Sequence, residues 1–369
     1  MTRVLFVAAM GGLGGPVRRL ATLLSNLKDV ERVLIKPESR LLDARLATLG
    51  AVDEHHPVRR SAQRNRFGAA AIAWAVLRRC MDRRAPIHVI HANGLVEFAL
   101  SWPAAIICRV PVVTWVGNYE PPRFVQRCRW IFRRVARRTK WNAVSGFAAN
   151  VIVECGLAQR DDVRVVTNIV DPDDIAPPPD LATANSRPKN DSAVTVGYLQ
   201  VARWEKGFDL VPRTISALSD LRGRVRFLII GAKNDHPGWD ELLGLPSELV
   251  EIRPRTAQVG EIYAACDVVF SPSRRESFNR VVAEAMMSGT PVVASDLAPV
   301  REVVGDGGLL FRCGDVEDAA RQLRRMVIDP DLRRTCAQRG RARSAAWHPE
   351  PVAATFADLY RSTRIHPVR

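Results

Sequence analysis

The sequence predicts an α/β protein with two parallel, doubly wound sheets, and three observations lead to this fold class. The chain has 369 residues, which exceeds the size at which one hydrophobic core usually keeps growing. Apolar runs of strand length alternate with segments of helical period, as in parallel sheets covered by helices. A segment rich in Pro, Asn and Ser divides this alternation into two series. We therefore expect an N-terminal domain over 1–175, a linker over 176–192 and a C-terminal domain over 193–350.

The N-terminal series begins with an apolar strand, Val4–Ala9, that runs into the glycine loop Gly11–Gly15. After Pro16, leucines recur at helical spacing, so this unit predicts a strand, a loop and a helix. Similar units follow along the chain. Their strands are expected near 32–36, 87–91, 111–116, 141–145 and 163–166, and their helices near 39–49, 66–84, 95–108, 122–138 and 146–155.

The C-terminal series repeats the alternation after the linker. Its strands are expected near 194–199, 225–231, 249–252, 268–271, 291–294 and 308–311, and its helices near 207–219, 258–265, 280–288, 298–304, 315–328 and 331–345. A last helix, about 351–362, follows Trp347-His348-Pro349. We expect this C-terminal segment, 351–369, to complete the N-terminal domain.

The chain is strongly basic, with 54 Lys and Arg against 39 Asp and Glu and a formal net charge of +15. Such an excess predicts an anionic partner: nucleic acid, a membrane surface or a phosphorylated substrate. The excess is densest over 123–140, where eight basic residues and no acid occur. Two interpretations of this segment stay open. It is either a helix docked on the sheet with a solvated basic back, or a helix that contacts an anionic membrane or holds a lipid-phosphate acceptor.

Several classes of protein are not expected. Nucleic-acid binding is disfavoured because aromatic residues make up only 7% of the chain and no recognised binding module occurs. A NAD site is disfavoured because Val17 takes the place of the third glycine in G-x-G-x-x-G. The seven cysteines contain no C-x-x-C pair, which fits a reducing compartment. No apolar run reaches the roughly 20 residues of a membrane span. We expect a cytoplasmic protein that meets a membrane, if at all, at its inner surface.

Two glutamates form the most informative pattern of the C-terminal series. Glu276 lies in the loop after a predicted strand, and Glu284 lies about one turn into the next helix, which Gly289 and Pro291 end. Open α/β sheets bind ligands at the carboxyl ends of their strands, where the N–H groups of a helix suit a phosphate. Carboxylates that faced a phosphate would repel it. Both glutamates should therefore accept hydrogen bonds from neutral hydroxyls of a sugar or a ribose.

Two cations, Arg203 and Lys206, lie in the loop after the first strand of the C-terminal series. An arginine can hold two phosphate oxygens in a fork, and a lysine supplies a compact charge. Together they would neutralise a diphosphate.

These motifs resemble those of the retaining nucleotide-sugar glycosyltransferases of glycosyltransferase family 4, in which two Glu are separated by seven residues. The resemblance extends over nearly the whole chain. It includes Arg203–Gly207, Tyr263–Ser273, Glu302–Val304, Gly11–Gly15, Ile90–Gly94 and Asn168–Asp171. The resemblance implies two facing Rossmann-like domains, the GT-B fold, with the active site in the cleft between them.

The resemblance also implies a role for each matched position. Arg203 and Lys206 would bind the donor diphosphate and stabilise it as it leaves. Glu276 would hold hydroxyls of the donor sugar, and Glu284 would hold those of the ribose. Retaining transfer in this family is thought to use front-face attack without a protein nucleophile, so positioning and charge stabilisation would provide the catalysis.

Further residues are expected to contact the donor. Backbone amides of Phe278 and Asn279 would complete the cradle for sugar and phosphate, and Arg253 would flank the base. The glycine loop would let the backbone approach the donor phosphate or the acceptor. The donor-binding set is thus Glu284, Ser277, Phe278, Asn279, Arg253, Gly14 and Gly15. No metal and no cofactor besides the nucleoside-diphosphate sugar are expected, because the two cations and helix N–H groups can neutralise the diphosphate.

The sequence departs from the family pattern at two places that concern the sugar. Ser277 stands where the family usually has Gly, so the backbone there must avoid a conformation reserved for glycine or accept strain. The histidine common at the end of the strand near 111–116 is replaced by Val116. Its role would pass to Asn118 or to His91, although His91 alone equally fits a core or strand-end histidine.

The sequence therefore predicts a retaining, metal-independent glycosyltransferase. Its acceptor is expected to be a glycan or a lipid-linked, anionic acceptor of cell-envelope or polysaccharide biosynthesis. A nucleotide-sugar epimerase or a phosphorylase of the same architecture is the alternative, although an epimerase would need additional acid/base residues. The base, the sugar and the acceptor stay open.

Overall fold

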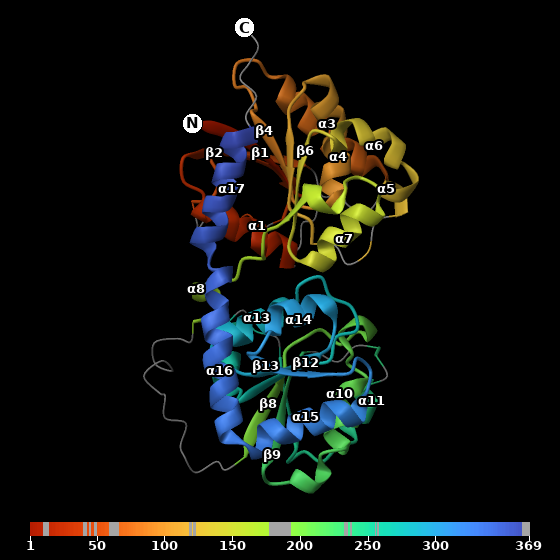
Figure 1. The fold of residues 1–369 in the computed structure, drawn as a ribbon, viewed down its shortest axis with the longest axis vertical. Coiled ribbons are helices and arrows are strands. Elements are labelled where there is room, and N and C mark those ends of the chain that lie inside the picture. The colour runs from red at the N-terminus through yellow and green to blue at the C-terminus, as the bar shows by residue number, and fades with distance from the viewer. Residues whose placement is uncertain are drawn as a thin grey trace. The chain divides into compact units, whose positions relative to one another are not determined.

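The computed structural model describes residues 1–9, 15–39, 43, 46–47, 50–58, 66–117, 120, 123–176, 193–231, 235–236, 238–254, 256 and 258–363. The chain forms two compact units. Unit 1 runs from Met1 to Ile169 and includes the chain from Trp347 onward, and unit 2 is Val170–Ala346. Each unit contains one parallel sheet with helices on its faces (Figure 1). The predicted α/β class with two doubly wound, Rossmann-like sheets is confirmed.

Among the described residues, seven strands form the sheet of unit 1, in the order β3-β2-β1-β4-β5-β6-β7. Every neighbouring pair is parallel. The strand order reverses between β1 and β4, which is where open α/β sheets bind ligands at the carboxyl ends. The strands are β1 (Thr2–Val7), β2 (Val30–Pro37), β3 (Glu54–Val58), β4 (Val89–Ala92), β5 (Val112–Thr114), β6 (Thr139–Ala143) and β7 (Val163–Val165).

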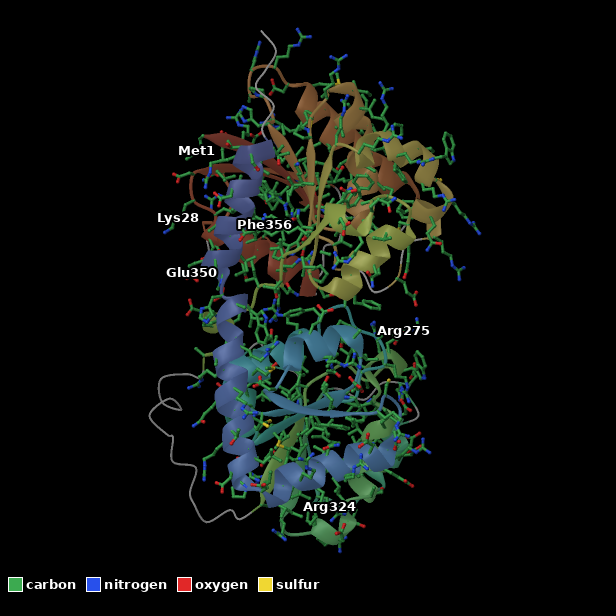
Figure 2. The ribbon with its side chains drawn as sticks, viewed as in Figure 1. Met1, Lys28, Arg275, Arg324, Glu350 and Phe356 are labelled. Carbon is green, nitrogen blue, oxygen red and sulfur yellow. The ribbon has the colours of Figure 1, made fainter. Side chains whose placement is uncertain are left out.

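The helices of unit 1 include the last helix of the chain, α17. Its buried residues Val352, Phe356 and Tyr360 recur every four positions, so they lie on one face of the helix. This face packs against β1 and β5, and α17 also contacts α1 (Figures 1 and 2). Among the described residues, the helices of unit 1 are α1 (Gly15–Asn26), α3 (Arg66–Met81), α4 (Leu95–Ile107), α5 (Arg123–Arg127), α6 (Arg129–Ala136), α7 (Gly146–Glu154) and α17 (Pro349–Thr363), with the short 3-10 turn η2 (Arg160–Asp162). The 3-10 turn η5 (Ala345–Trp347) spans the boundary between the two units.

Among the described residues, six strands form the sheet of unit 2, in the order β10-β9-β8-β11-β12-β13, and all neighbouring pairs are parallel. The order reverses between β8 and β11, so the loops that follow these two strands meet at the ligand-binding position. The strands are β8 (Val194–Tyr198), β9 (Val225–Ile230), β10 (Val250–Arg253), β11 (Val268–Ser271), β12 (Val292–Ser295) and β13 (Gly308–Phe311).

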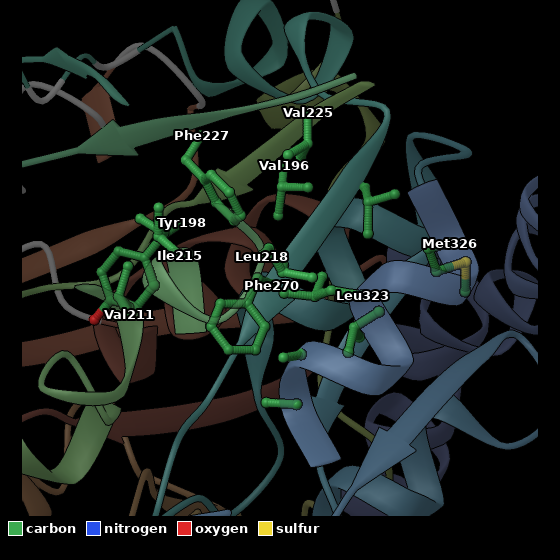
Figure 3. Packing of buried hydrophobic residues seen from close by; sticks show 14 of the residues in the cluster. Val196, Tyr198, Val211, Ile215, Leu218, Val225, Phe227, Phe270, Leu323 and Met326 are labelled. Carbon is green, nitrogen blue, oxygen red and sulfur yellow. The ribbon is translucent and has the colours of Figure 1, made fainter. Parts of the chain in front are cut away.

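A hydrophobic core holds the central strands of unit 2 in place. Val196 of β8, Phe227 of β9 and Phe270 of β11 pack with Leu323 and Met326 of α15 (Figure 3). Each such buried side chain contributes about 2 kcal/mol to stability, which keeps β8 and β11 in register. The helices of unit 2 are α8 (Pro172–Ile175), α10 (Leu210–Ser216), α11 (Gly238–Leu243), α12 (Val259–Ala265), α13 (Arg280–Met287), α14 (Ala298–Val304), α15 (Val316–Ile328) and α16 (Pro330–Ser344), with the 3-10 turns η3 (Trp204–Lys206) and η4 (Ser219–Leu221).

The structure differs from the predicted elements in four places. Strand β3 was not predicted, because Glu54–Val58 lacks an apolar run and alternates half-buried with exposed residues beside β2. The segment 122–138 was predicted as one helix, but α5 and α6 are separated at Cys128, whose ψ of 16° interrupts the helix. The short helices α8 and α11 were also not predicted. The helix predicted over 39–49 lies largely outside the described residues.

Candidate active site

The loop after β8 places Lys206 at the ligand-binding position of unit 2. Arg203 begins the turn η3, and its carbonyl accepts hydrogen bonds from the amides of Lys206 (3.1 Å) and Phe208 (3.3 Å). Gly207 ends the turn with a φ of 65°, and a Cβ there would lie 1.9 Å from the carbonyl oxygen of Pro272. Only glycine permits this approach of the two loops. The glycine therefore brings the β8 loop against the loop that follows β11.

Lys206 and Glu276 meet across these two loops. The Lys206 Nζ lies 2.6 Å from Glu276 Oε1, and the Ser273 hydroxyl donates to the same oxygen at 2.9 Å. The Glu276 side chain is 10% exposed and the Lys206 side chain is 29% exposed, so the pair remains open to a ligand. Among the described residues, Glu276 Oε2 has no hydrogen-bond partner. Both charged residues were predicted from the sequence, whereas the part of Ser273 was not.

Arg203 lies on the same loop as Lys206, with its side chain exposed. Within the described part of the chain, its guanidinium forms no ion pair and no hydrogen bond. The group is therefore available to an anion that binds beside Lys206.

Two further arginines, which sequence reasoning missed, lie beside this pair. The guanidinium groups of Arg274 and Arg275 lie 5.2 and 5.4 Å from the ring centroid of Trp204. Arg274 also forms a bidentate ion pair with Asp209, at 2.6 and 2.7 Å. Burial acts to raise the pKa of Asp209, but the hydrogen bond and charge of Arg274 outweigh it and hold that pKa below its usual value. The sequence shows these cations, but not that Asp209 pairs with one of them.

The N-terminus of α13 follows the Glu276 loop. Asn279 caps the helix in the left-handed region, with a φ of 69°. Its Oδ1 accepts a hydrogen bond from the amide of Val282, and its Nδ2 donates to Ser271 Oγ at 2.8 Å. Among the described residues, the positive φ values outside glycine do not include Ser277. Ser277 therefore avoids the glycine-only conformation, and the left-handed residue of this loop is Asn279.

Glu284 lies one turn into α13, as the spacing predicted, and it is 6% exposed. Its Oε2 accepts a hydrogen bond from the Tyr263 hydroxyl at 2.8 Å, and its Oε1 accepts one from the Arg280 guanidinium. Arg280 in turn lies 3.5 Å from a carboxylate oxygen of Asp174. Burial, together with the charge of Glu284, raises the pKa of Tyr263 well above its usual value, so Tyr263 remains a donor. The four-residue spacing of Arg280 and Glu284 in the sequence could have indicated this ion pair. Tyr263 belongs to another helix, α12, so no local spacing indicates its bond to Glu284.

Arg253 lies at the carboxyl end of β10, exposed and paired with Glu251. The strand order puts β9 and β8 between β10 and β11, so Arg253 does not join the pair formed by Lys206 and Glu276.

The predicted residues of unit 1 have different outcomes. Gly14 and Asn118 lie outside the described residues. Gly15 begins α1, and a Cβ added to it would contact nothing within 4 Å. His91 is fully buried on β4, and its Nδ1 lies 2.8 Å from the Tyr360 hydroxyl. The environment of His91 is thus that of a core histidine, one of the two alternatives in the sequence analysis.

A buried arginine and a buried glutamate near the carboxyl ends of β1 and β4 were not predicted from the sequence. Arg19 donates to Asn93 Oδ1 and to the carbonyl of Trp115, each at 2.8 Å, and stacks over the Trp115 ring. Glu97 accepts a hydrogen bond from the amide of Ala9, and burial raises the pKa of this carboxyl. Residues after β1 and β4 are therefore joined by buried polar contacts at the reversal of the strand order in unit 1.

The basic segment over 123–140 buries one apolar stripe and exposes its cations. Val125, Phe132 and Val135 are buried, whereas Phe124 and Trp130 are 44% and 72% exposed. The arginines of this segment are exposed, with the structure describing all of α5 and α6. Within the described residues, no helix is long and apolar enough to cross a membrane, and no cluster of His, Cys, Asp or Glu is suited to hold a metal ion.

Comparison with known proteins connects these features to one family. The family described as Glycosyl transferases group 1 matches residues 190–329, and the family described as Glycosyltransferase Family 4 matches residues 10–174. Between them the two matches cover most of the chain.

Curated relatives give the same family. A D-inositol 3-phosphate glycosyltransferase of Stackebrandtia nassauensis is 32% identical over 200 residues, which cover 50% of this chain and 45% of that protein. A 2-deoxystreptamine glucosyltransferase of Streptomyces kanamyceticus is 29% identical over 290 residues, which cover 70% of this chain and 74% of that protein. The match thus spans less than half the length of the first of these relatives.

Solved structures share the fold. Anabaena HepE, crystallised with UDP and glucose, superposes with a TM-score of 0.80 at 20% identity and covers 98% of this chain and 100% of its own. A glycosyltransferase of Rickettsia africae superposes with a TM-score of 0.78 at 16% identity, covering 98% of both chains. These similarities establish the GT-B fold. Taken with the two family matches, they show that the chain belongs to glycosyltransferase family 4, among the glycosyl transferases of group 1.

Proposed function

We propose that this protein is a retaining glycosyltransferase that moves a sugar from a nucleoside-diphosphate sugar to an acceptor. One observation carries the proposal: Lys206 Nζ and Glu276 Oε1 lie 2.6 Å apart where the strand order reverses between β8 and β11. A cation and a carboxylate at this position suit a ligand that has both phosphate and hydroxyl groups.

Arg203 and Lys206 are the proposed ligands of the donor diphosphate. Arg203 is exposed beside Lys206, and the guanidinium can hold two phosphate oxygens while the ammonium contributes a point charge. Both charges would stabilise the diphosphate more strongly as it leaves, because negative charge accumulates on it in the transition state. Their fixed positive charge is the reason that we propose transfer without a metal ion.

Glu276 is the proposed ligand of the donor sugar. Lys206 and Ser273 both donate to its Oε1, which holds the carboxylate in place. Among the described residues Oε2 has no partner, so this oxygen can accept a sugar hydroxyl. Neutralisation by Lys206 also reduces the repulsion between this carboxylate and a neighbouring phosphate.

Glu284 is the proposed ligand of the ribose. The bonds from Tyr263 and Arg280 fix its carboxylate and leave one lone pair on each oxygen. Because Glu284 is only 6% exposed, a ribose would have to approach its carboxylate closely at the edge of α13.

We further propose that the acceptor is anionic, either a phosphorylated polyol or a lipid-linked glycan, and that the protein works at the cytoplasmic face of a membrane. The exposed cations of α5 and α6 support attraction to such an acceptor or to an anionic lipid surface. Relatives named for inositol 3-phosphate also support a phosphorylated acceptor. The UDP in the HepE crystals makes UDP sugars the first donors to test.

The test is a transfer assay with Lys206→Ala and Glu276→Ala, using UDP and GDP sugars that raise the melting temperature. We expect each variant to lose about 100-fold or more in kcat/KM, because each removes a group that contacts the charged or hydroxylated part of the transition state. Glu248→Ala is the matched control, because Glu248 forms an exposed pair with Arg222 in the same unit. If Lys206→Ala or Glu276→Ala kept the wild-type kcat/KM, that result would contradict the role proposed for the substituted residue.

A further inference from the structure

Unit 1 contains a pocket of about 830 Å³ at the amino-terminal edge of its sheet. The pocket is lined by residues that precede β4 and β5, by the junction of α6 and β6, and by Ser362 and Thr363 at the end of α17. The contacts of Arg19 with Asn93 and Trp115, which follow β4 and β5, lie at the opposite, carboxyl edge of the same sheet. The pocket is therefore separate from the ligand-binding position of this unit.

Of the residues that the structure describes, four cations and no carboxylate line this pocket. The cations are Arg109, Arg134, Arg138 and Lys140. Among the described residues, none of these four side chains has an ion-pair or hydrogen-bond partner. Arg32 of the same unit, by contrast, is paired with Asp53. Four unpaired charges of one sign around one cavity repel each other, and an anion bound in the cavity would relieve that repulsion.

Arg109 has a strained backbone conformation, and its side chain lines the pocket. Arg109 follows the C-terminus of α4 with a φ of 56°, in the left-handed region where glycine is favoured. An arginine at this position has an unfavourable backbone, yet its side chain contributes to the lining. This position thus has a cation where local conformation alone would favour glycine.

The remaining lining supplies a hydroxyl and an apolar wall. Thr363 Oγ1 is buried, and it has no hydrogen-bond partner among the described residues. Buried polar atoms normally have partners, so this hydroxyl is suited to a ligand oxygen. Val112 and Val135 are buried side chains of the wall. The pocket therefore combines anion-binding groups with a surface for the carbon skeleton that carries the anion.

We propose that this pocket binds a phosphate ester, with the phosphate held by the arginines and Lys140 and its organic part against the apolar wall. Guanidinium groups match the paired oxygens of a phosphate. The ester could come from a soluble metabolite or from the headgroup of an anionic phospholipid, and both present the same group. Occupancy of this pocket does not depend on the proposed transfer reaction.

The test compares two double variants, each with one substitution in α6 and one just after it. Arg134→Gln with Arg138→Gln removes two cations of the lining. Arg133→Gln with Arg137→Gln removes two neighbouring exposed cations that do not line the pocket. Both variants lower the net charge equally. Glycerol 3-phosphate is titrated by calorimetry, and sedimentation is measured with phosphatidylcholine vesicles with and without phosphatidylglycerol. The titrations are made in a Lys206→Ala background, so that the proposed donor site does not contribute.

We expect the lining variant to weaken binding about tenfold or more, and the control variant to change it less than about twofold. Selective loss with glycerol 3-phosphate identifies a soluble ester, and selective loss only with phosphatidylglycerol vesicles identifies a lipid headgroup. If both double variants lost the same amount of binding, the attraction would be diffuse and the proposal would be overturned. The proposal would also be overturned if the protein with an intact pocket bound neither glycerol 3-phosphate nor the phosphatidylglycerol vesicles.

Arg109→Gly supplies a second measurement that separates binding from folding. Glycine relieves the left-handed backbone, so this variant should melt at the same or a higher temperature than the wild type. It should nevertheless bind the phosphate probe more weakly. A variant that is more stable and binds equally well would show that Arg109 has no part in the pocket.

Discussion

The buried histidine of unit 1 makes stability depend on pH. Burial, with the positive charge of Arg19, lowers the pKa of His91 to about 3. The same side chain titrates at about 6.5 in an unfolded chain. Between these values the unfolded chain binds a proton at this ring and the folded protein does not. The free energy of unfolding therefore falls as the pH falls through this window.

The size of this effect follows from the shift. Each unit of pKa difference corresponds to about 1.4 kcal/mol. Between pH 7 and pH 4 the unfolded ring becomes almost fully protonated while the folded ring stays neutral, so His91 alone lowers the free energy of unfolding by about 3 kcal/mol. This is a large part of the stability of an ordinary domain.

The substitution His91→Gln removes the titrating ring and so isolates the contribution of His91 to the pH dependence of the free energy of unfolding. Urea unfolding at pH 7 and pH 4 is followed by tryptophan fluorescence, because all but two of the eight tryptophans, Trp204 and Trp239, belong to unit 1. The wild type should lose about 3 kcal/mol more than the variant between the two pH values. Tyr360→Phe removes the hydrogen-bond partner of His91 but leaves the imidazole ring in place. This variant should be less stable than the wild type and should keep the wild-type pH dependence.

Other groups do not obscure the comparison. Burial raises the pKa of Glu97, so acidification changes its contribution in the opposite direction. That contribution is common to the wild type and the variant and cancels in the difference. Equal losses of free energy in the wild type and His91→Gln would refute the reasoning, because His91 would then be protonated in the folded protein.

Two further predictions concern the candidate site of unit 2. Asn279→Ala should lower the free energy of unfolding by about 2 kcal/mol, because it loses the helix cap and the bond to Ser271 and keeps a left-handed backbone. Asn279→Gly should be less destabilising, and calorimetric unfolding that ranks the two variants in the reverse order would contradict the assigned backbone strain. Tyr263→Phe removes one of the two donors to Glu284 and should raise the KM of the sugar nucleotide more than it changes kcat. A variant with wild-type KM would show that Tyr263 does not position this carboxylate.

Strongly apolar strands could be predicted closely from the sequence. The strand predicted over 268–271 is β11 as observed, and the strand predicted over 194–199 differs from β8 by one residue. Both strands are buried on two faces, so nearly every position must be apolar and the pattern is clear. Strand β3 has one neighbour, β2, and half-exposed side chains, so its residues satisfy no such constraint and no pattern marked it.

Charged residues of the site could be selected from the sequence, but not their partners. The seven-residue separation of Glu276 and Glu284 and the position of Lys206 after a strand are local features of the chain. The contact of Lys206 with Glu276 joins positions 70 residues apart, and that of Tyr263 with Glu284 joins positions 21 apart. Such contacts depend on which strands are neighbours in the sheet, and this order is not written in any local pattern.

The sequence by itself determined the two α/β series, the excess of positive charge and the residue types available for binding a phosphate and a sugar. Tertiary structure decided how those residues are used. It put β8 beside β11 and so brought Lys206 to Glu276, and it buried His91 among aromatic rings instead of leaving it at a strand end. It also gathered unpaired cations around a pocket at the amino edge of the first sheet. Local spacing sets which side chains an element carries, whereas strand order and packing set which of them meet.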